Sequence, residues 1–130
     1  IGLTRGVTNA HIARAVLQSI AFSIKDIIDA IYDYTKTKVK DIRIDGGASN
    51  NNLLAQMFAD YLDCRIVRPS SVEATRLAGL YSGFWKEEDL ERAMVYDAEF
   101  SSQMEKELRE KSYSNYKDAV KRCLGWMADK

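Results

Sequence analysis

Apolar side chains recur at helical spacing across the first quarter of the chain. This spacing predicts one long amphipathic helix from about Asn9 to Tyr34, because residues three and four apart share a face. Thr8 or Asn9 can cap its amino end by accepting hydrogen bonds from unpaired N–H groups. The apolar stripe consists of Ile12, Val16, Ile20, Ile24, Ile27, Ile28 and Ile31.

The pattern then changes to short apolar runs separated by polar residues. We expect a strand from Val39 to Ile44, a helix from about Asn51 to Leu62, and a second strand from Cys64 to Arg68. Pro69 should end that strand, because proline cannot donate to a ladder. The order strand, helix, strand predicts a parallel βαβ unit. The apolar face of its helix comprises Leu53, Leu54, Met57, Phe58 and Tyr61.

The remaining pattern is weaker. We expect a helix rich in small residues from about Val72 to Trp85, a short acidic helix from Lys86 to Ala93, and irregular or extended chain from Met94 to Phe100. A highly charged helix should follow, from about Ser102 to Met127. Its predicted buried edge consists of Tyr113, Tyr116, Val120, Cys123, Leu124 and Trp126.

Composition narrows the classes of protein that fit. The 130 residues suffice for one modest domain, and a net charge of zero favours neither nucleic acid nor a membrane surface as partner. No apolar run reaches the roughly 18 residues that span a bilayer. Cys64, Cys123 and the single histidine, His11, predict no metal site and no disulfide. We therefore expect two reduced core thiols in a cytoplasmic protein, and no catalytic role for His11.

The segment from Asp45 to Asn52 carries the strongest chemical signal. Gly46 and Gly47 stand where a strand turns into a helix, so the backbone can approach a ligand closely. The helix that follows would present N–H groups and a positive dipole end, which suit phosphate. The asparagine amides could read a base or ribose edge. The segment thus favours nucleotide contact at the carboxyl end of a strand, although a tight turn followed by helix caps would read the same way.

Several motifs in one order resemble the carboxyl-terminal part of the FGGY carbohydrate kinases, and within that family the glycerol kinases. The resemblance covers nearly the whole chain. Its residues are Gly2-Leu3-Thr4-Arg5-Gly6, His11 to Ala15, Ser19 to Phe22, Asp45 to Ala48 with Asn51 and Asn52, Arg68-Pro69, Glu73, Thr75, Leu77 to Leu80, Gly83 to Trp85, and Ala119 to Arg122 with Trp126.

This resemblance implies an α/β fold of the ribonuclease-H-like, actin-like ATPase class, with residues 1–130 forming one partial carboxyl-terminal domain. It implies ATP or ADP with Mg²⁺ as the nucleotide, and glycerol as the acceptor held by an amino-terminal domain. By resemblance, Asp45 and Gly46 shape the turn, Gly47 and Ala48 lie at the nucleotide, and Asn51 meets the adenine. No catalytic residue and no metal ligand is implied in this chain, so we expect it to be inactive by itself.

One departure from the family pattern keeps alternatives open. Between Thr75 and Leu77 the chain is about five residues shorter than the family pattern, which puts nucleotide affinity in doubt. The alternatives are another FGGY sugar kinase or a non-catalytic structural or interaction domain.

Apolar surface on the first helix and on the βαβ unit would favour self-association, so we expect a homo-oligomer.

Overall fold

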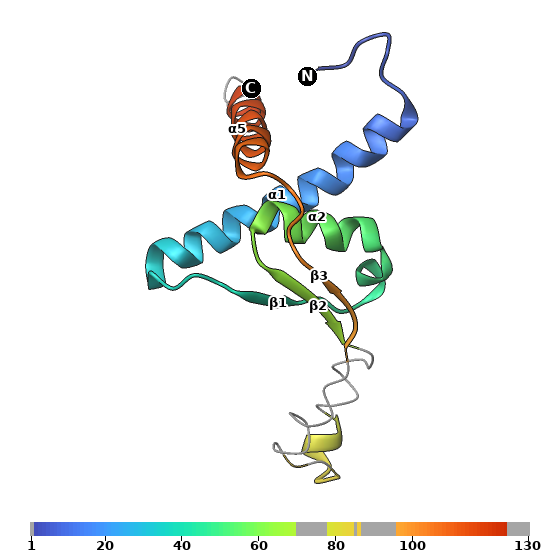
Figure 1. The fold of residues 1–130 in the computed structure, drawn as a ribbon, viewed down its shortest axis with the longest axis vertical. Coiled ribbons are helices and arrows are strands. Elements are labelled where there is room, and N and C mark those ends of the chain that lie inside the picture. Colours follow the sequence, from blue (N-terminus) through green and yellow to red (C-terminus); the bar gives the residue numbers. More distant parts are fainter. Residues whose placement is uncertain (1, 70–77, 85, 87–95, 125–130) are drawn as a thin grey trace, which may run out of the picture.

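The computed structural model describes residues 2–69, 78–84, 86 and 96–124, and confirms most of the predicted order of elements (Figure 1). Residues 78–81 are helical, within the predicted helix 72–85. Residues 82–84 form a turn and a bend, so the helix ends earlier than predicted, and residue 86 is not helical. Residues 72–77 and 85, the acidic segment 87–93 and Trp126 lie outside the described residues. The elements are α1 (Asn9–Thr35), β1 (Asp41–Arg43), the 3₁₀ helix η1 (Gly47–Asn50), α2 (Asn52–Leu62), β2 (Arg65–Pro69), β3 (Tyr96–Phe100) and α5 (Lys106–Cys123).

The sheet has the order β1-β2-β3 and contains both kinds of pairing. β1 and β2 are parallel, with Ile42 opposite Ile66, so the predicted βαβ unit is confirmed. β2 and β3 are antiparallel, with Ile66 opposite Phe100 and a register shift between Arg68 and Pro69. The segment predicted as irregular or extended is therefore a sheet strand. Its alternation of polar and apolar residues is the signal for a half-buried strand.

Both α1 and α2 pack on the sheet side that carries Ile66, and α1 also lies along α2 (Figure 1). Burial of apolar side chains between these layers supplies the main driving force for folding. The buried cluster between the helices and the sheet consists of Ala59, Leu62, Cys64 and Ile66, with Ile24, Ile28, Ile42, Ile44, Phe58 and Phe100 packed around it.

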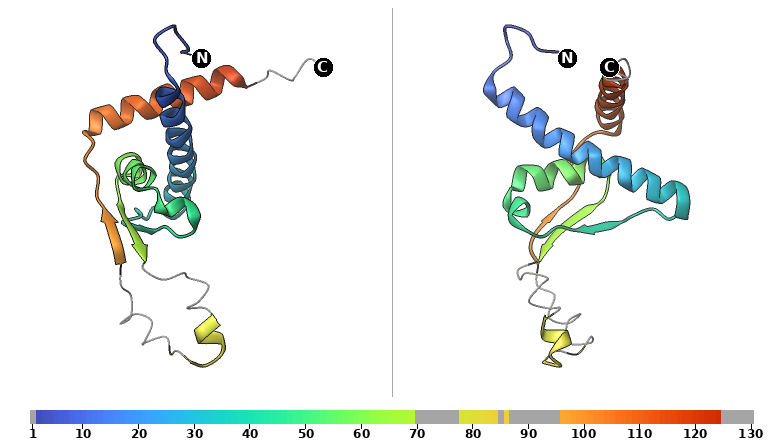
Figure 2. Two further views of the ribbon diagram at one scale, coloured as in Figure 1. Left: turned by 90° about the vertical axis from the view of Figure 1, so that its right-hand side faces the viewer. Right: turned by 180° about the vertical axis from the view of Figure 1, so that it is seen from behind.

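An aromatic cluster joins the three helices. The ring centroid of Phe22 in α1 lies 4.6 Å from that of Tyr61 in α2 and 4.9 Å from that of Tyr116 in α5. The hydroxyl of Tyr113 donates a hydrogen bond to Asp26 of α1, which also pairs with Lys117 at 2.8 Å. α5 crosses α1 at this point and continues past it (Figure 2).

The predicted buried edge of the last helix is only partly correct. Tyr113 and Tyr116 pack on the core, but Val120, Cys123 and Leu124 are exposed, because this part of α5 extends beyond α1. Cys123 is therefore not the core thiol that we predicted. Cys64 is buried as predicted, and its burial raises the pKa of the thiol to about 11, so the thiol stays protonated at neutral pH.

The apolar stripe of α1 is divided between the core and the surface. Ile24 and Ile28 face α2 and the sheet. Leu53 of α2, predicted on the apolar face, is also half exposed. The part of the stripe that remains 41–55% exposed consists of Ile12, Val16, Ile20, Ile27 and Ile31, which we call the outer face of α1.

His11 lies in the first turn of α1 and contacts the residue that caps this helix. Thr8 is the N-cap residue, and its backbone N–H donates to Nδ1 of His11 at 3.2 Å. This reciprocal arrangement satisfies groups that the first helical turn leaves unpaired. The contacts of His11 thus place it at the helix cap.

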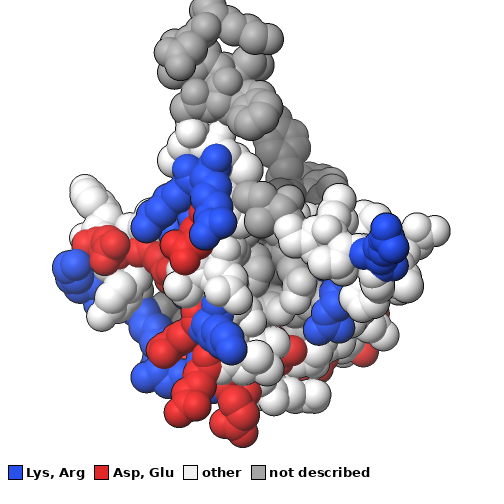
Figure 3. All heavy atoms as spheres, turned by 90° about the horizontal axis from the view of Figure 1, so that it is seen from above, with Lys and Arg blue, Asp and Glu red and all other residues white. Residues whose placement is uncertain are grey.

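Figure 3 shows basic and acidic side chains interspersed on one face of the molecule. Within the described residues, no helix combines the length and the apolar character needed to cross a membrane.

Candidate functional site

The carboxyl ends of β1 and β2 lie at the same edge of the sheet because the two strands are parallel. The turn from Asp45 to Asn51 follows β1 at this edge, and Arg68 and Pro69 end β2 there. β3 runs in the opposite direction, so its first residues, Tyr96 and Asp97, reach the same place. Crevices at the carboxyl ends of parallel strands are the usual ligand sites of open α/β sheets.

Side-chain hydrogen bonds hold the turn in shape. Gly46 has φ +89° and ψ 176°, a conformation that is essentially restricted to glycine. Its N–H donates to Oδ1 of Asp45 at 2.6 Å. Its carbonyl accepts from the hydroxyl and the backbone N–H of Ser49, at 2.7 and 3.0 Å. Ser49 is itself buried, so both bonds lie at the inner side of the turn.

The turn contains a 3₁₀ helix, which differs from the expected direct entry into α2. η1 contains Gly47 and Ala48, and α2 begins only at Asn52. Asn51 is the N-cap of α2, where its Oδ1 accepts from the backbone N–H of Leu54 at 3.2 Å. Because this oxygen already caps the helix, recognition of a base through Asn51 would use its Nδ2 donor.

Within the part of the chain that the structure describes, the outer side of the turn is uncovered. There, a Cβ atom built on Gly46 or Gly47 would meet no atom beyond its neighbours along the chain within 4 Å. Ala48, Asn50 and Asn51 are exposed along the same stretch. The five residues that the sequence singled out, Asp45, Gly46, Gly47, Ala48 and Asn51, thus lie together on one turn at the carboxyl end of β1.

Sequence reasoning missed that Arg68 belongs to this site. Its Nη1 donates to the carbonyl of Ser49 at 2.8 Å and to Oδ1 of Asn52 at 2.9 Å. Its Nε donates to Asp97 at 2.8 and 3.1 Å. The Arg68-Pro69 motif was visible in the sequence, but no local pattern shows which carbonyl a strand arginine will reach.

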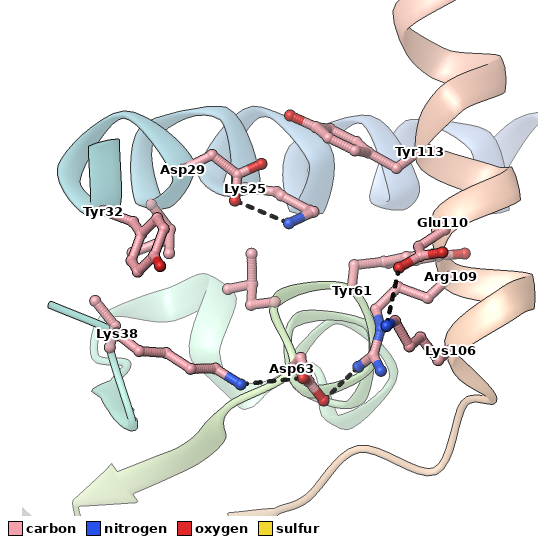
Figure 4. Close-up of a pocket in the computed structure, with 13 residues that line it drawn as sticks. Lys25, Asp29, Tyr32, Lys38, Tyr61, Asp63, Lys106, Arg109, Glu110 and Tyr113 are labelled. Carbon is pink, nitrogen blue, oxygen red and sulfur yellow. Dashed lines mark hydrogen bonds and ion pairs between the residues drawn. The ribbon is translucent and has the colours of Figure 1, made fainter. Parts of the chain in front are cut away.

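A cavity of about 240 Å³ lies at the opposite edge of the sheet, between α1, α5 and the carboxyl end of α2 (Figure 4). Burial raises the pKa of the Asp63 carboxyl, but hydrogen bonds from Lys38 and Arg109 outweigh this and hold it below its usual value. The ion pairs here are Lys25–Asp29 at 2.9 Å, Lys38–Asp63 at 3.3 Å, Arg109–Asp63 at 2.6 Å and Lys106–Glu110 at 3.7 Å. Since its basic groups already pair with carboxylates, we interpret the cavity as a junction between elements.

Among the described residues, no group of three or more His, Cys, Asp or Glu side chains is placed to hold a metal ion. We therefore assign no metal ligand to them.

Known proteins resemble this chain along most of its length. The profile of the FGGY family of carbohydrate kinases, C-terminal domain, matches residues 1–85. The chain is 44% identical to glycerol kinase 2 of Sulfolobus acidocaldarius, with 97% of the chain and 27% of that protein covered. For glycerol kinase 2 of Saccharolobus solfataricus, the identity is 43% and the coverage 97% and 26%.

Solved structures agree in fold. The crystal structure of Plasmodium falciparum glycerol kinase with ADP superposes with a TM-score of 0.84 at 30% identity, covering 95% of this chain and 26% of that one. A xylulose kinase from Rhodospirillum rubrum superposes with a TM-score of 0.72 at 15% identity, covering 94% of this chain and 26% of that one, which shows a shared fold only. The chain spans about a quarter of the length of the curated relatives that it matches.

Proposed function

Since this chain belongs to the FGGY family of carbohydrate kinases, we propose that it is the nucleotide-binding part of an ATP-dependent glycerol kinase, an enzyme that converts glycerol to glycerol 3-phosphate. The observation that carries the proposal is the Gly46-Gly47 turn at the carboxyl edge of the parallel pair, within the matched residues 1–85. The glycerol branch is favoured because the relatives with 43–44% identity are glycerol kinases.

The family resemblance suggests a role for each residue of the turn, and the geometry is compatible with these roles. Asp45 and Gly46 shape the turn, while the backbone of Gly47 and Ala48 lies against the phosphates, where the missing Cβ of Gly47 allows close approach. Asn51 caps α2 through Oδ1 and would donate from Nδ2 to the base. The residues of this chain therefore bind and orient the nucleotide, and catalysis of phosphoryl transfer consists mostly of positioning together with electrostatic stabilisation.

ATP bound with Mg²⁺ would supply the transferable phosphoryl group. We assign the glycerol site and the catalytic base to the part of the enzyme that lies outside this chain, so the isolated chain should not phosphorylate glycerol. The proposed setting is the cytoplasm, where ATP is abundant and thiols such as Cys64 stay reduced.

Nucleotide binding is tested by titrating ADP with Mg²⁺ into isotope-labelled protein and following backbone amides by NMR. We expect shifts concentrated at Gly46, Gly47, Ala48 and Asn51. Well-dispersed spectra with no shift in these amides would contradict nucleotide binding by this chain.

A test of the proposed kinase activity requires the amino-terminal part of the enzyme. Adding a folded amino-terminal part of a glycerol kinase, with ATP, Mg²⁺ and glycerol, should give measurable glycerol 3-phosphate. The control is the same mixture with a Gly47→Val chain, which should lose most of the product because a branched side chain fills the open side of the turn. Absence of product from two demonstrably folded pieces would count against the assignment.

A further inference from the structure

Two arginines of β2 differ in their surroundings although they are three residues apart. The side chain of Arg65 is 43% exposed and pairs with Glu99 and Asp41 across the sheet. The side chain of Arg68 is only 14% exposed and points to the edge where the glycine turn lies. A guanidinium with so little access to water needs its donors satisfied by protein groups.

Among the described residues, the partners of Arg68 come from three separate segments. Nη1 donates to Ser49 of η1 and to Asn52, the first residue of α2, and Nε donates to Asp97 of β3. The planar guanidinium presents its donors in a fixed arrangement, so such contacts fix geometry as well as contribute energy. Arg68 thus connects the 3₁₀ helix, the start of α2 and the third strand.

The contact with Ser49 matters most for the turn. The hydroxyl and N–H of Ser49 hold the carbonyl of Gly46, and its own carbonyl is held by Arg68. Gly46 has an unusual backbone conformation, which persists only when the surrounding structure holds it in place. A chain of contacts therefore runs from Asp97 through Arg68 and Ser49 to Gly46.

We propose that Arg68 is a positioning residue that holds the 46–51 turn in the shape that receives the nucleotide phosphates, and that Asp97 orients Arg68 for this purpose. The proposal rests on the proposed function, because it names the residue that prepares the same site. It also gives β3 a role in that site, although the strand lies about fifty residues further along the chain than the turn.

The test compares Arg68→Gln with the matched control Arg65→Gln, which removes an ion-paired arginine from the same strand. Backbone amide spectra are recorded first without ligand. We expect Arg68→Gln to shift the amides of residues 46–52 and to speed their hydrogen exchange. Arg65→Gln should leave those amides unchanged. Thermal unfolding of each variant separates a general loss of stability from a local change.

ADP with Mg²⁺ is then titrated into each protein. Arg68→Gln should raise the ADP Kd by about tenfold or more, whereas Arg65→Gln should stay within about twofold of the unmodified chain. Arg68→Lys keeps the charge but lacks the planar fork that reaches Ser49, Asn52 and Asp97 together, so it should fold and still bind ADP more weakly than the unmodified chain. Asp97→Asn should show a smaller change in the same direction.

The outcomes separate the two proposals. If the unmodified chain binds ADP and the Arg68 variants bind it equally well with unchanged turn amides, the positioning role is wrong and the proposed function stands. If the unmodified chain does not bind ADP, nucleotide binding by this chain is wrong. The ligand-free amides then decide about Arg68: unchanged shifts at residues 46–52 in Arg68→Gln would overturn the proposal. Should Arg68→Gln fail to fold, the same comparison is made with Arg68→Lys.

Discussion

Gly46 and Gly47 are neighbours, but they are glycines for different physical reasons. Gly46 has φ +89° and ψ 176°, whereas the φ of Gly47 lies outside the left-handed range. Gly46→Ala should therefore lower the free energy of unfolding by about 1–3 kcal/mol through backbone strain. Gly47→Ala should change stability by less than about 1 kcal/mol.

The pair also separates stability from binding. If the backbone of Gly47 lies against phosphate, Gly47→Ala should weaken ADP binding by about tenfold, because the new methyl group occupies the open side of the turn. Urea unfolding and ADP titration of both variants provide the measurements. A Gly47→Ala protein with unchanged ADP affinity would show that the nucleotide approaches from another side.

Asp26 gives the molecule a pH dependence. Hydrogen bonds from Lys117 and then Tyr113 hold the pKa of its carboxyl below the usual value of 3.8. A carboxyl whose pKa is lower in the folded state stabilises the protein above its unfolded pKa, and this contribution is lost as the pH falls through the folded value. Asp26→Asn should therefore lose less stability than the unmodified chain between pH 7 and about pH 3.

The control for Asp26 is Asp33→Asn, which removes an exposed carboxylate 3.9 Å from Lys36 in the same helix. Surface pairs of this kind contribute little. Unfolding curves at both pH values are compared for the three proteins. If Asp26→Asn loses as much stability between the two pH values as Asp33→Asn does, the loss of stability in acid does not come from Asp26.

Phe22 joins α1, α2 and α5, because its ring contacts Tyr61, Tyr113 and Tyr116. Phe22→Ala should cost about 3–5 kcal/mol, since it removes a buried aromatic ring and leaves a cavity between three helices. Tyr34→Ala is the matched control in α1, where the ring is 91% exposed, and it should cost less than about 0.5 kcal/mol. Urea unfolding measures both, and equal costs would mean that the cluster does not hold the helices.

The sequence predicted those elements whose signals are local. Helical spacing located α1, a capping asparagine located the start of α2, and Pro69 located the end of β2. β3 was expected only as irregular or extended chain, because the alternation from Tyr96 to Phe100 is short and the partner strand β2 lies about thirty residues earlier in the chain. Periodicity could not predict which residues of the α1 stripe are buried and which are exposed, since spacing shows which apolar residues share a face but not what covers that face.

The candidate site divides in the same way. The turn from Asp45 to Asn51 was visible because its glycines and asparagines are adjacent in the sequence and match a family motif. The contacts of Arg68 with Ser49 and Asp97 join segments 19 and 29 residues apart, and they appear only when the sheet is assembled. Recognition of a site from sequence thus finds the residues at the ligand more readily than those that hold them.

The outer face of α1 should make the isolated chain associate with itself. Its isoleucines and valine are 41–55% exposed, and a net charge of zero provides no long-range repulsion between copies. We expect dimers or larger species at high concentration. Ile27→Lys should weaken this association by about tenfold or more, because it places a charge in the apolar contact.

Leu108→Lys is the matched control, since Leu108 is 54% exposed on α5 and Ile27 is 55% exposed on α1. Sedimentation velocity across a range of concentrations measures the association of all three proteins. A monomer at every concentration of the unmodified chain, or an equal effect of both lysines, would contradict an interface on the outer face of α1.

The register between β2 and β3 has a consequence for engineering the chain. Pro69 and Tyr96 are partners in the ladder, so the chain leaves the sheet and returns to it at almost the same point. The described residues 78–84 lie well away from the sheet (Figure 1). A short hairpin turn in place of residues 70–95 would therefore connect the two strands without altering their pairing, and the result would be a miniature scaffold that carries the glycine turn, Arg68 and Asp97 in a shorter polypeptide.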